Sequence, residues 1–299
     1  MNKKLDCLVT GEANVDLLIG ASVSLEPGKE KLAHDIRLVL GGSSSITAFN
    51  LAALGIKVGF IGVIGHDAFG GFIEQRLAWA GVDLEGLRRD KTRRTGITVW
   101  FDNEGRRSGI TYPGTIPLLR VRDIPMRQLK RARHLHVGHY FLLTHLHPDA
   151  PALFERAKRM GLTTSLDCNY DPSEKWNSRI EQVLRHTDIF FPNAQEALRL
   201  TEHHSVEAAA RELGKLARIV AVKLGAEGVL MFHDGDSFRV PARKVRVADT
   251  TGAGDSFNAG FLSQFLRGAS LQLSAKAGVT AAARCVGKVG GTAAFEPKP

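Results

Sequence analysis

The sequence predicts an α/β protein with a mainly parallel central sheet, because short apolar runs alternate with helical patterns along most of its 299 residues. Glycines stand where helix ends are expected: Gly55, Gly81 and Gly161 follow three of the helical patterns. The expected strands of this sheet include 57–63, 134–137, 163–166, 188–191 and 219–223. The expected helices include 45–54, 71–80, 150–159, 194–200, 205–216, 256–266 and 271–286.

Two early pairs of segments break this alternation and predict a second, smaller sheet. The pairs are 15–20 with 36–40 and 96–101 with 108–112, and the second pair flanks Asp102-Asn103-Glu104-Gly105, a favourable hairpin turn. Strands that interrupt a βαβ series need not join the main sheet. They can form a flap over its carboxyl edge, where ligands of open α/β sheets bind. The sequence has no linker or low-complexity stretch, so we expect one domain that carries this flap.

Composition and charge favour a protein without nucleic-acid or membrane partners. Apolar residues make up 43% and charged residues 24%, as in ordinary soluble proteins. The formal net charge of +9 suits an anionic ligand, but the basic residues are scattered in pairs rather than gathered in a stripe with aromatic residues. The uncharged run between Arg37 and Lys57 contains three serines, a threonine and an asparagine, which are unsuited to lipid.

The cysteines and the first residues predict a cytoplasmic location. Cys7, Cys168 and Cys285 are too few and too far apart for a disulfide framework or a metal knuckle, which suits a reducing compartment. The first residues lack the apolar segment of a secretory signal.

An anion site is expected after the last strand, in the stretch VADTTGAGDSF at 247–257. A glycine turn that leads into a helix gathers free backbone N–H groups and the positive end of the helix dipole. Asp255 lies at the mouth of this site, which leaves two interpretations. It is either a helix N-cap, or a general base that takes a proton from an alcohol while the adjacent N–H groups hold a phosphoryl group.

The segment DTTGAGDSF at 249–257 resembles the carboxyl-terminal signature of the ribokinase family, also called the PfkB carbohydrate kinases. The stretch from Gly41 to Gly55 fits the family's amino-terminal signature, and GEANVD at 11–16 resembles its first strand and sugar-binding carboxylate. The resemblance extends from about residue 9 to residue 292. It implies a ribokinase-like three-layer α/β/α sandwich with a mainly parallel central sheet. It also implies a single kinase domain over 1–299, with a β-sheet lid built from about 12–40 and 95–113.

The same resemblance implies transfer of the γ-phosphate of ATP to a hydroxyl of a small sugar or sugar derivative. Asp255 would be the general base, and the amides of Gly252, Ala253, Gly254 and Asp255 would form the anion hole. We expect Asp255 to be ionised at neutral pH, because the amides and the helix dipole favour the charged form of a group whose reference pKa is about 3.9.

On the acceptor side, Asn14 and Asp16 would hydrogen-bond sugar hydroxyls. Gly41 and Gly42 would let the backbone approach the sugar and would act as the hinge of the lid. Without the other motifs, Asp16 would be interpreted as a turn or strand-edge residue, and the alternative for the glycine pair is a plain turn into the following helix. Asn169, at the end of another strand, resembles a residue near the phosphate and the metal.

On the donor side, FFPNAQE at 190–196 resembles the family's Asn-x-x-Glu motif, which implies a nucleotide contact for Asn193 and a water-mediated Mg²⁺ contact for Glu196. The same spacing is a helix capping box, and the two roles are compatible. Lys223, Gly225 and Gly228 lie in a stretch that resembles the strand and glycine loop bordering ATP; taken alone, it is an ordinary β-turn.

Other positions concern a monovalent cation and the identity of the sugar. Asp249 and Thr251 fit the start of the loop where some family members hold such an ion, so they are candidate K⁺ ligands. Ile46 stands where ribokinase itself has an Asn that reaches the sugar, and Ser43 stands where it has a Lys. Tyr170 follows Asn169, whereas kinases of 2-keto-3-deoxygluconate often carry an Arg shortly after this Asn. These departures leave the acceptor open.

Two rival functions are a nucleoside kinase of the same fold and a non-catalytic sugar-binding protein. An intact Asp255 and a complete glycine turn argue against the second. Five histidines lie between 134 and 147 without an acidic partner at metal-ligand spacing, so we interpret them as strand and loop residues, with His139 and Tyr140 near the substrate. Homodimers formed through the lid are common in the family, and Val99 and Phe101 are apolar positions that fit such an interface.

Overall fold

The central sheet of the computed structural model has nine strands within the described residues, which are 4–20, 27–103 and 106–296. These strands are β1 (Leu5–Gly11), β4 (Val58–Gly65), β5 (Asp83–Asp90), β8 (Ala132–Gly138), β9 (Thr163–Leu166), β10 (Ile189–Phe190), β11 (Ile219–Lys223), β12 (Val229–His233) and β13 (Asp236–Val240). Their order is β13-β12-β11-β10-β9-β8-β1-β4-β5. Neighbours from β11 to β5 are parallel, and β12 is antiparallel to both of its neighbours.

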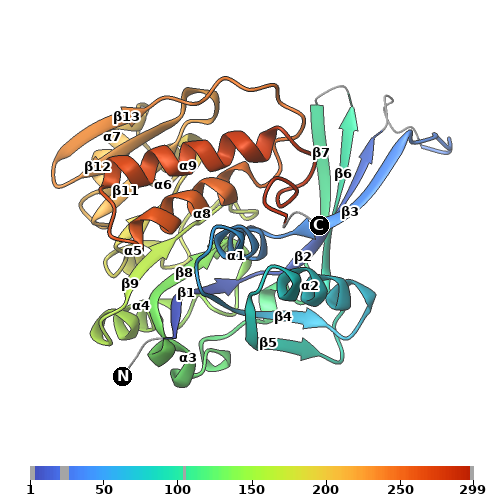
Figure 1. The fold of residues 1–299 in the computed structure, drawn as a ribbon, viewed down its shortest axis with the longest axis horizontal. Helices are drawn as coiled ribbons and strands as arrows, with labels where there is room; N and C mark the ends of the chain where they lie inside the picture. The colour runs from blue at the N-terminus through green and yellow to red at the C-terminus, as the bar shows by residue number, and fades with distance from the viewer. Residues whose placement is uncertain (1–3, 21–26, 104–105, 297–299) are drawn as a thin grey trace.

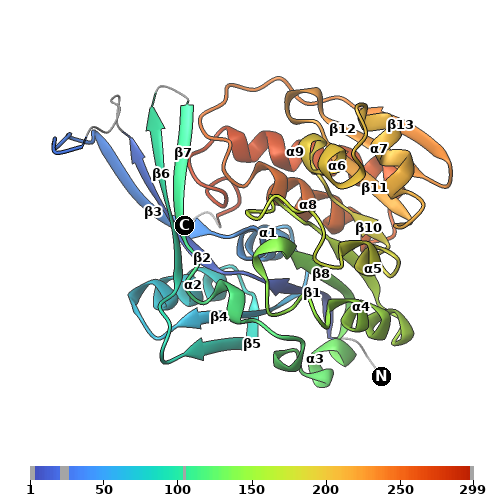
Figure 2. The ribbon, with the colours of Figure 1, turned by 180° about the vertical axis from the view of Figure 1, so that it is seen from behind.

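Helices cover both faces of this sheet, as Figures 1 and 2 show from opposite sides. One layer contains α1 (Ser43–Ala53), α2 (Ala68–Trp79), α8 (Ala253–Phe265) and α9 (Leu271–Val286). The other contains α3 (Met126–Arg131), α4 (Ala150–Arg159), α5 (Ile180–Leu184), α6 (Ala194–Thr201) and α7 (Val206–Leu213). Side chains of β1 alternate between the two cores, with Cys7 and Val9 in one and Leu8 in the other. The predicted three-layer α/β/α sandwich is confirmed.

Short 3₁₀ helices complete the connections. They are η1 (Ile116–Leu118), η2 (Val121–Asp123), η3 (Tyr140–Leu142) and η4 (Gly225–Glu227). Within the described ranges, no helix is both long enough and apolar enough to cross a membrane.

The predicted second sheet is present and stands to one side of the main sheet (Figure 1). Its strands are β2 (Asn14–Gly20), β3 (Asp35–Gly41), β6 (Gly96–Asn103) and β7 (Arg106–Tyr112), in the order β3-β2-β6-β7. The central pair, β2 and β6, is parallel and the outer pairs are antiparallel. The tip of the predicted β6–β7 turn, at 104–105, lies outside the described residues.

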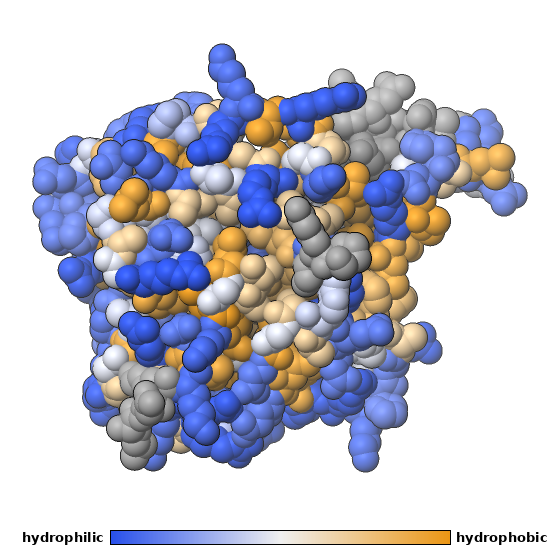
Figure 3. Space-filling view, in the orientation of Figure 1, coloured by the Kyte–Doolittle hydropathy of each residue, from blue (hydrophilic) through white to orange (hydrophobic). Residues whose placement is uncertain are grey.

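The two faces of the second sheet differ in polarity. Asn14, Asp16 and Thr98 lie on one face, which we call the inner face. The opposite, outer face is apolar, and hydrophobic residues gather on the side of the molecule where this sheet lies (Figure 3). The residues of the outer face include Leu17, Ile19, Ile36, Leu38, Ile97, Val99, Ile110 and Tyr112.

The boundaries of most elements agree with the sequence to within a few residues, and one difference matters for function. Helix α8 begins at Ala253 rather than 256, because Gly252 adopts a left-handed conformation (φ 70°) and forms the N-cap. Asp255 is therefore the third residue of the helix. The interpretation of Asp255 as an N-cap is wrong.

Candidate active site

Asp255 is held at the start of α8 by a contact with the start of α1. The Ser43 hydroxyl donates to Asp255 Oδ1 over 2.5 Å, and the Asp255 side chain is almost fully buried. Glycine is required at 252, because its backbone is left-handed and a Cβ would lie 2.6 Å from the Cα of Gly291. Two segments 212 positions apart in the sequence thus meet at one carboxylate.

The pKa of Asp255 moves in the direction opposite to the one expected from its amides and the helix dipole. Burial raises this pKa to about 6, the negative charge of Asp167 adds to the increase, and the Ser43 hydrogen bond and Lys223 oppose it. Asp255 is still mostly ionised at neutral pH, but it is a stronger proton acceptor than an exposed aspartate. A pKa near the working pH suits a general base.

The turn before α8 leaves backbone donors next to this carboxylate. Ala253 N–H donates to the carbonyl of Thr250 over a long 3.3 Å. Gly254 and Asp255 are the second and third residues of the helix, so their N–H groups have no acceptor within it. The Lys223 ammonium approaches the same turn, 3.4 Å from the position that a Cβ on Gly254 would take. Amides and ammonium together favour an anion here.

Lys223 lies at the centre of a buried group of charges. Its Nζ is 2.7 Å from Asp167 Oδ2, which also accepts a hydrogen bond from Asn258 Nδ2. Burial would raise the pKa of Asp167, but the Lys223 and Asn258 contacts lower it below its usual value. Burial would likewise lower the pKa of Lys223, but Asp167, Glu196 and Asp255 raise it. The pair is therefore ionised, with the positive charge directed at the turn before α8.

Asn193 and Glu196 form the predicted capping box at the start of α6. Asn193 Oδ1 accepts from Glu196 N–H and Glu196 Oε2 accepts from Asn193 N–H, each over 2.9 Å. Burial and the negative charge of Asp167 raise the pKa of Glu196 to about 7, and Lys223 opposes the shift. The cap fixes the carboxylate beside the Asp167–Lys223 pair, so the two interpretations of this motif are structurally compatible.

The inner face of the second sheet brings together the predicted acceptor residues. Asn14 Nδ2 donates to Asp16 Oδ1 over 3.1 Å and to Thr98 Oγ1 over 3.4 Å. The glycine pair at the end of β3 is tightly constrained: a Cβ at Gly41 would collide with Asp16, and one at Gly42 (φ 83°) would lie 2.7 Å from Asn14 Oδ1. The backbone of the glycine pair thus lies directly against the two polar side chains.

A second acid at the carboxyl end of β1 was not singled out as a site residue by the sequence. Glu12 Oε2 accepts from Ser44 Oγ over 2.8 Å, and Glu12 Oε1 is 3.2 Å from His139 Nδ1. Burial alone would lower the pKa of His139, but the hydrogen bond and charge of Glu12, with the charges of Asp167 and Asp255, raise it. His139 follows β8, and the negative charge of Asp255 contributes to its raised pKa.

The remaining predicted residues lie in loops around this centre. Asn169 has a left-handed backbone (φ 54°) and a buried Nδ2 atom without a partner among the described residues. After β11, η4 begins at Gly225 (φ 58°) and is followed by Gly228 (φ 102°), where a Cβ would collide with the carbonyl of Val240. Asp249 Oδ1 accepts from Thr251, and Asp249 Oδ2 accepts from Gly290 N–H over 2.8 Å.

Most of the histidines between 134 and 147 have ordinary hydrogen-bond partners, although the buried Nε2 of His136 has none among the described residues. His134 and His136 both contact Ser165 Oγ, and His147 contacts the carbonyl of Tyr140. Over the described ranges, the structure contains no group of three or more His, Cys, Asp or Glu side chains that could hold a metal ion.

Four residues that make polar contacts in the site were not among the site residues predicted from the sequence. They are Ser43, Ser44, Glu12 and Asp167. Glu12 and Asp167 each come directly after a largely buried strand, β1 and β9, at the carboxyl edge of the sheet where ligands of α/β proteins bind. Their position could therefore have identified them. No feature of the sequence identified Ser43 and Ser44 as site residues, because serines are common at the start of a helix.

Comparison with known proteins identifies the family of this chain. The family model for pfkB family carbohydrate kinases matches residues 4–299. An uncharacterized sugar kinase from Archaeoglobus fulgidus is 30% identical over 240 residues, which cover 80% of this chain and 95% of that protein. An ATP-dependent ribose-1-phosphate kinase from Halopiger xanaduensis is 31% identical over 262 residues, which cover 87% of this chain and 84% of that protein.

The fold is shared with solved structures. A ribokinase from Arabidopsis thaliana, complexed with ribose and ATP, has a TM-score of 0.83 and 24% identity, covering 98% of this chain and 96% of that one. The chain belongs to the pfkB family of carbohydrate kinases and is a phosphotransferase that acts on an alcohol.

Proposed function

We propose that this kinase transfers the γ-phosphate of ATP to a hydroxyl of a small sugar or sugar derivative, with Asp255 as the general base. The observation that carries the proposal is the placement of one buried carboxylate, with its pKa raised to about 6, beside the Lys223 ammonium and a helix start where the Gly254 and Asp255 amides have no acceptor within the helix. Phosphoryl transfer depends mainly on such positioning and charge stabilisation. The Arabidopsis ribokinase structure is complexed with ribose and ATP.

In this mechanism, the acceptor hydroxyl lies between Asp255 and the inner face of the second sheet. Asp16 and Asn14 bind other hydroxyls of the sugar, and Gly41 and Gly42 let it approach the backbone. Asp255 takes the proton of the attacking hydroxyl. The amides of Gly252, Ala253, Gly254 and Asp255 then hold the phosphoryl group in transit, with Lys223 offsetting its charge.

The second sheet would act as a lid on a single kinase domain. Its polar inner face carries the acceptor residues, so closure would exclude water and limit hydrolysis of ATP. We also propose a homodimer formed through the outer face, because Ile36, Leu38, Ile110 and Tyr112 are exposed there. The three cysteines are buried free thiols, which supports a reducing cytoplasmic location.

On the donor side, Asn193, Lys223, Gly225 and Gly228 would border ATP, and Asn169 would direct its unpartnered Nδ2 to a phosphate or a metal-bound water. Mg²⁺ prefers oxygen ligands and keeps several waters, which fits the single Glu196 carboxylate better than a cage of protein ligands would. The ion would neutralise phosphate charge during the transfer. Asp249 and the backbone of Thr251, beside the anion hole, would hold K⁺ as the monovalent ion.

A screen of ADP release over ketoses, aldoses, sugar acids and nucleosides tests the proposal. Release with a sugar or sugar acid, and none with nucleosides, is the expected result. Release with nucleosides alone would establish the nucleoside kinase instead. No release with any acceptor would favour a non-catalytic sugar-binding protein.

Glu196→Gln is expected to raise the Mg²⁺ concentration needed for half-maximal rate, because the variant loses the charge that orders the hydrated ion. A capping role alone would instead lower thermal stability, by roughly 1 kcal/mol, without changing the Mg²⁺ dependence. Titration of the rate with Mg²⁺ at fixed ATP measures this. Superimposable curves for the two proteins would remove Glu196 from the metal site.

Asp16→Ala is expected to weaken sugar binding far more than ATP binding. Hydrogen bonds to a charged group contribute roughly 1.5–3 kcal/mol, or about a tenfold to hundredfold change in affinity. Calorimetric titration of both ligands into both proteins measures the difference. Equal sugar affinity would place Asp16 outside the pocket.

A further inference from the structure

Ser43 joins the start of α1 to the start of α8 through one hydrogen bond. Its hydroxyl donates to Asp255 Oδ1 over 2.5 Å, and both side chains are buried. Among the described residues no other donor bonds to this carboxylate, so Asp255 Oδ2 has no hydrogen-bond partner within them. One oxygen of the carboxylate is therefore held, and the other is available to a ligand.

The turn that carries Ser43 also forms part of the predicted acceptor site. Strand β3 ends at Gly41, and Gly42 (φ 83°) turns the chain into α1, whose first residue is Ser43. The same two glycines pack against Asp16 and Asn14. This turn therefore sets the place of the proposed general base relative to the side chains proposed to bind the sugar.

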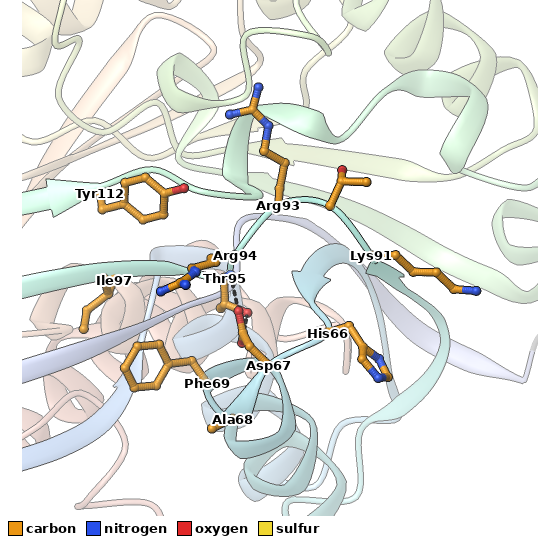
Figure 4. Close-up of a pocket in the computed structure, with 11 residues that line it drawn as sticks. His66, Asp67, Ala68, Phe69, Lys91, Arg93, Arg94, Thr95, Ile97 and Tyr112 are labelled. Atoms are coloured by element: carbon orange, nitrogen blue, oxygen red, sulfur yellow. Dashed lines mark hydrogen bonds between the residues drawn. The ribbon is translucent and has the colours of Figure 1, made fainter.

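A second aspartate at the start of a helix illustrates the effect of several donors. Asp67 is the N-cap of α2 and accepts hydrogen bonds from Gly70 N–H and from the N–H and hydroxyl of Thr95, which Figure 4 shows beside it. Burial would raise the pKa of Asp67, but these hydrogen bonds and the charge of Arg94 lower it below its usual value. Asp255 is buried more deeply and accepts one hydrogen bond, and burial raises its pKa to about 6. Several donors make a carboxylate a weak proton acceptor, whereas a single donor can orient it and leave it basic.

We propose that Ser43 is a positioning residue for phosphoryl transfer, which holds Asp255 Oδ1 so that Oδ2 takes the proton of the acceptor hydroxyl. This inference rests on the proposed role of Asp255 as the general base. The proton moves to Oδ2 while the hydroxyl oxygen bonds to the γ-phosphorus of ATP, and ADP leaves with the electron pair of the broken bond. A hydroxyl that donates to a carboxylate favours its charged form, so Ser43 also opposes the effect of burial on the pKa of Asp255.

The other groups around Asp255 are independent of the Ser43 hydroxyl. The charged or titratable side chains that interact electrostatically with Asp255 come from the ends of β1, β8, β9 and β11 and from α9. They are Glu12, His139, Asp167, Lys223 and Cys285. Within the described ranges none of them hydrogen-bonds to the Ser43 hydroxyl. A change in the pKa of Asp255 when this hydroxyl is removed is therefore due to the lost hydrogen bond.

Two measurements on Ser43→Ala test the proposal. Carboxyl-carbon NMR of the ligand-free protein, with the Asp255 signal assigned from Asp255→Asn, should give a pKa about one to two pH units above that of the parent. The acid limb of kcat/KM for the acceptor should move upward with it. The rate on the plateau above this limb should fall at least about tenfold, because the carboxylate loses its fixed orientation. Ser43→Thr keeps the hydroxyl and should restore both properties.

Ser45→Ala is the matched control, because Ser45 lies in the same buried turn but its hydroxyl donates to the carbonyls of the glycine pair. The pKa of Asp255 and the acid limb should be those of the parent in this variant, and the pKa of Asp67 should be the same in all the proteins. An Asp255 pKa or a plateau rate that is equal in Ser43→Ala and the parent would overturn the proposal alone. An Asp255 pKa that rises while the acid limb stays in place would show that Asp255 is not the general base, and would overturn the proposed mechanism as well.

Discussion

Asp255→Asn is expected to lower kcat by at least about a hundredfold, because general-base catalysis typically contributes on the order of 10²–10⁴ in rate. The amide keeps the size of the side chain and can still accept the Ser43 hydrogen bond. It cannot accept a proton. ATP binding should be retained or tightened, since a negative charge leaves the phosphate site.

The fold should survive the Asp255→Asn substitution. Asp255 is not the N-cap of α8, so no capping hydrogen bond is lost. Burial raises the pKa of Asp255 to about 6, so the folded protein loses stability as the pH rises and this carboxyl group ionises. A neutral amide at this position does not carry the free-energy cost of a buried charge. Thermal unfolding should show a protein at least as stable as the parent. Asp236→Asn, at an exposed position, is the control for turnover. Near-normal kcat in a folded Asp255→Asn protein would show that Asp255 is not the general base.

Lys223→Met is expected to lower the free energy of unfolding by about 3–5 kcal/mol, because removing one partner leaves the buried Asp167 charge uncompensated. Turnover should also fall, since Lys223 lies beside the turn before α8. Urea unfolding measures the stability. The control is Lys215→Met, whose exposed pair with Glu212 should contribute little to stability.

The double variant Asp167→Asn with Lys223→Met separates charge from packing. It should recover much of the lost stability, because neither charge is then left buried alone. A Lys223→Met protein as stable as Lys215→Met would contradict the buried pair, and so would a double variant no more stable than Lys223→Met.

Most of the fold could be predicted from local pattern. Strands such as 163–166 and 219–223 and helices such as 150–159 and 271–286 have the predicted limits, since apolar periodicity and glycine stops are properties of short segments. The second sheet was predictable because its strands interrupt the βαβ series. The early start of α8 was not, because it depends on a left-handed Gly252 packed against Gly291.

Site residues could be predicted only where they lie in a recognisable sequence motif. The contact of Ser43 with Asp255 and the pairing of Lys223 with Asp167 join segments that no local pattern relates. The direction of the Asp255 pKa was wrongly expected for the same reason. The amides and the dipole are visible in the sequence, whereas burial and the nearby Asp167 charge arise only when the layers pack.

The pH dependence of kcat/KM for the acceptor, at saturating Mg²⁺ and ATP, tests most directly whether Asp255 takes the proton. The base must be ionised, and burial raises its pKa to about 6. The rate should therefore be constant above about pH 7 and fall about tenfold per unit well below pH 6. The residual activity of Asp255→Asn should lack this acid limb. A parent enzyme whose kcat/KM stays constant down to about pH 5, or a variant that keeps the same acid limb, would contradict the assignment.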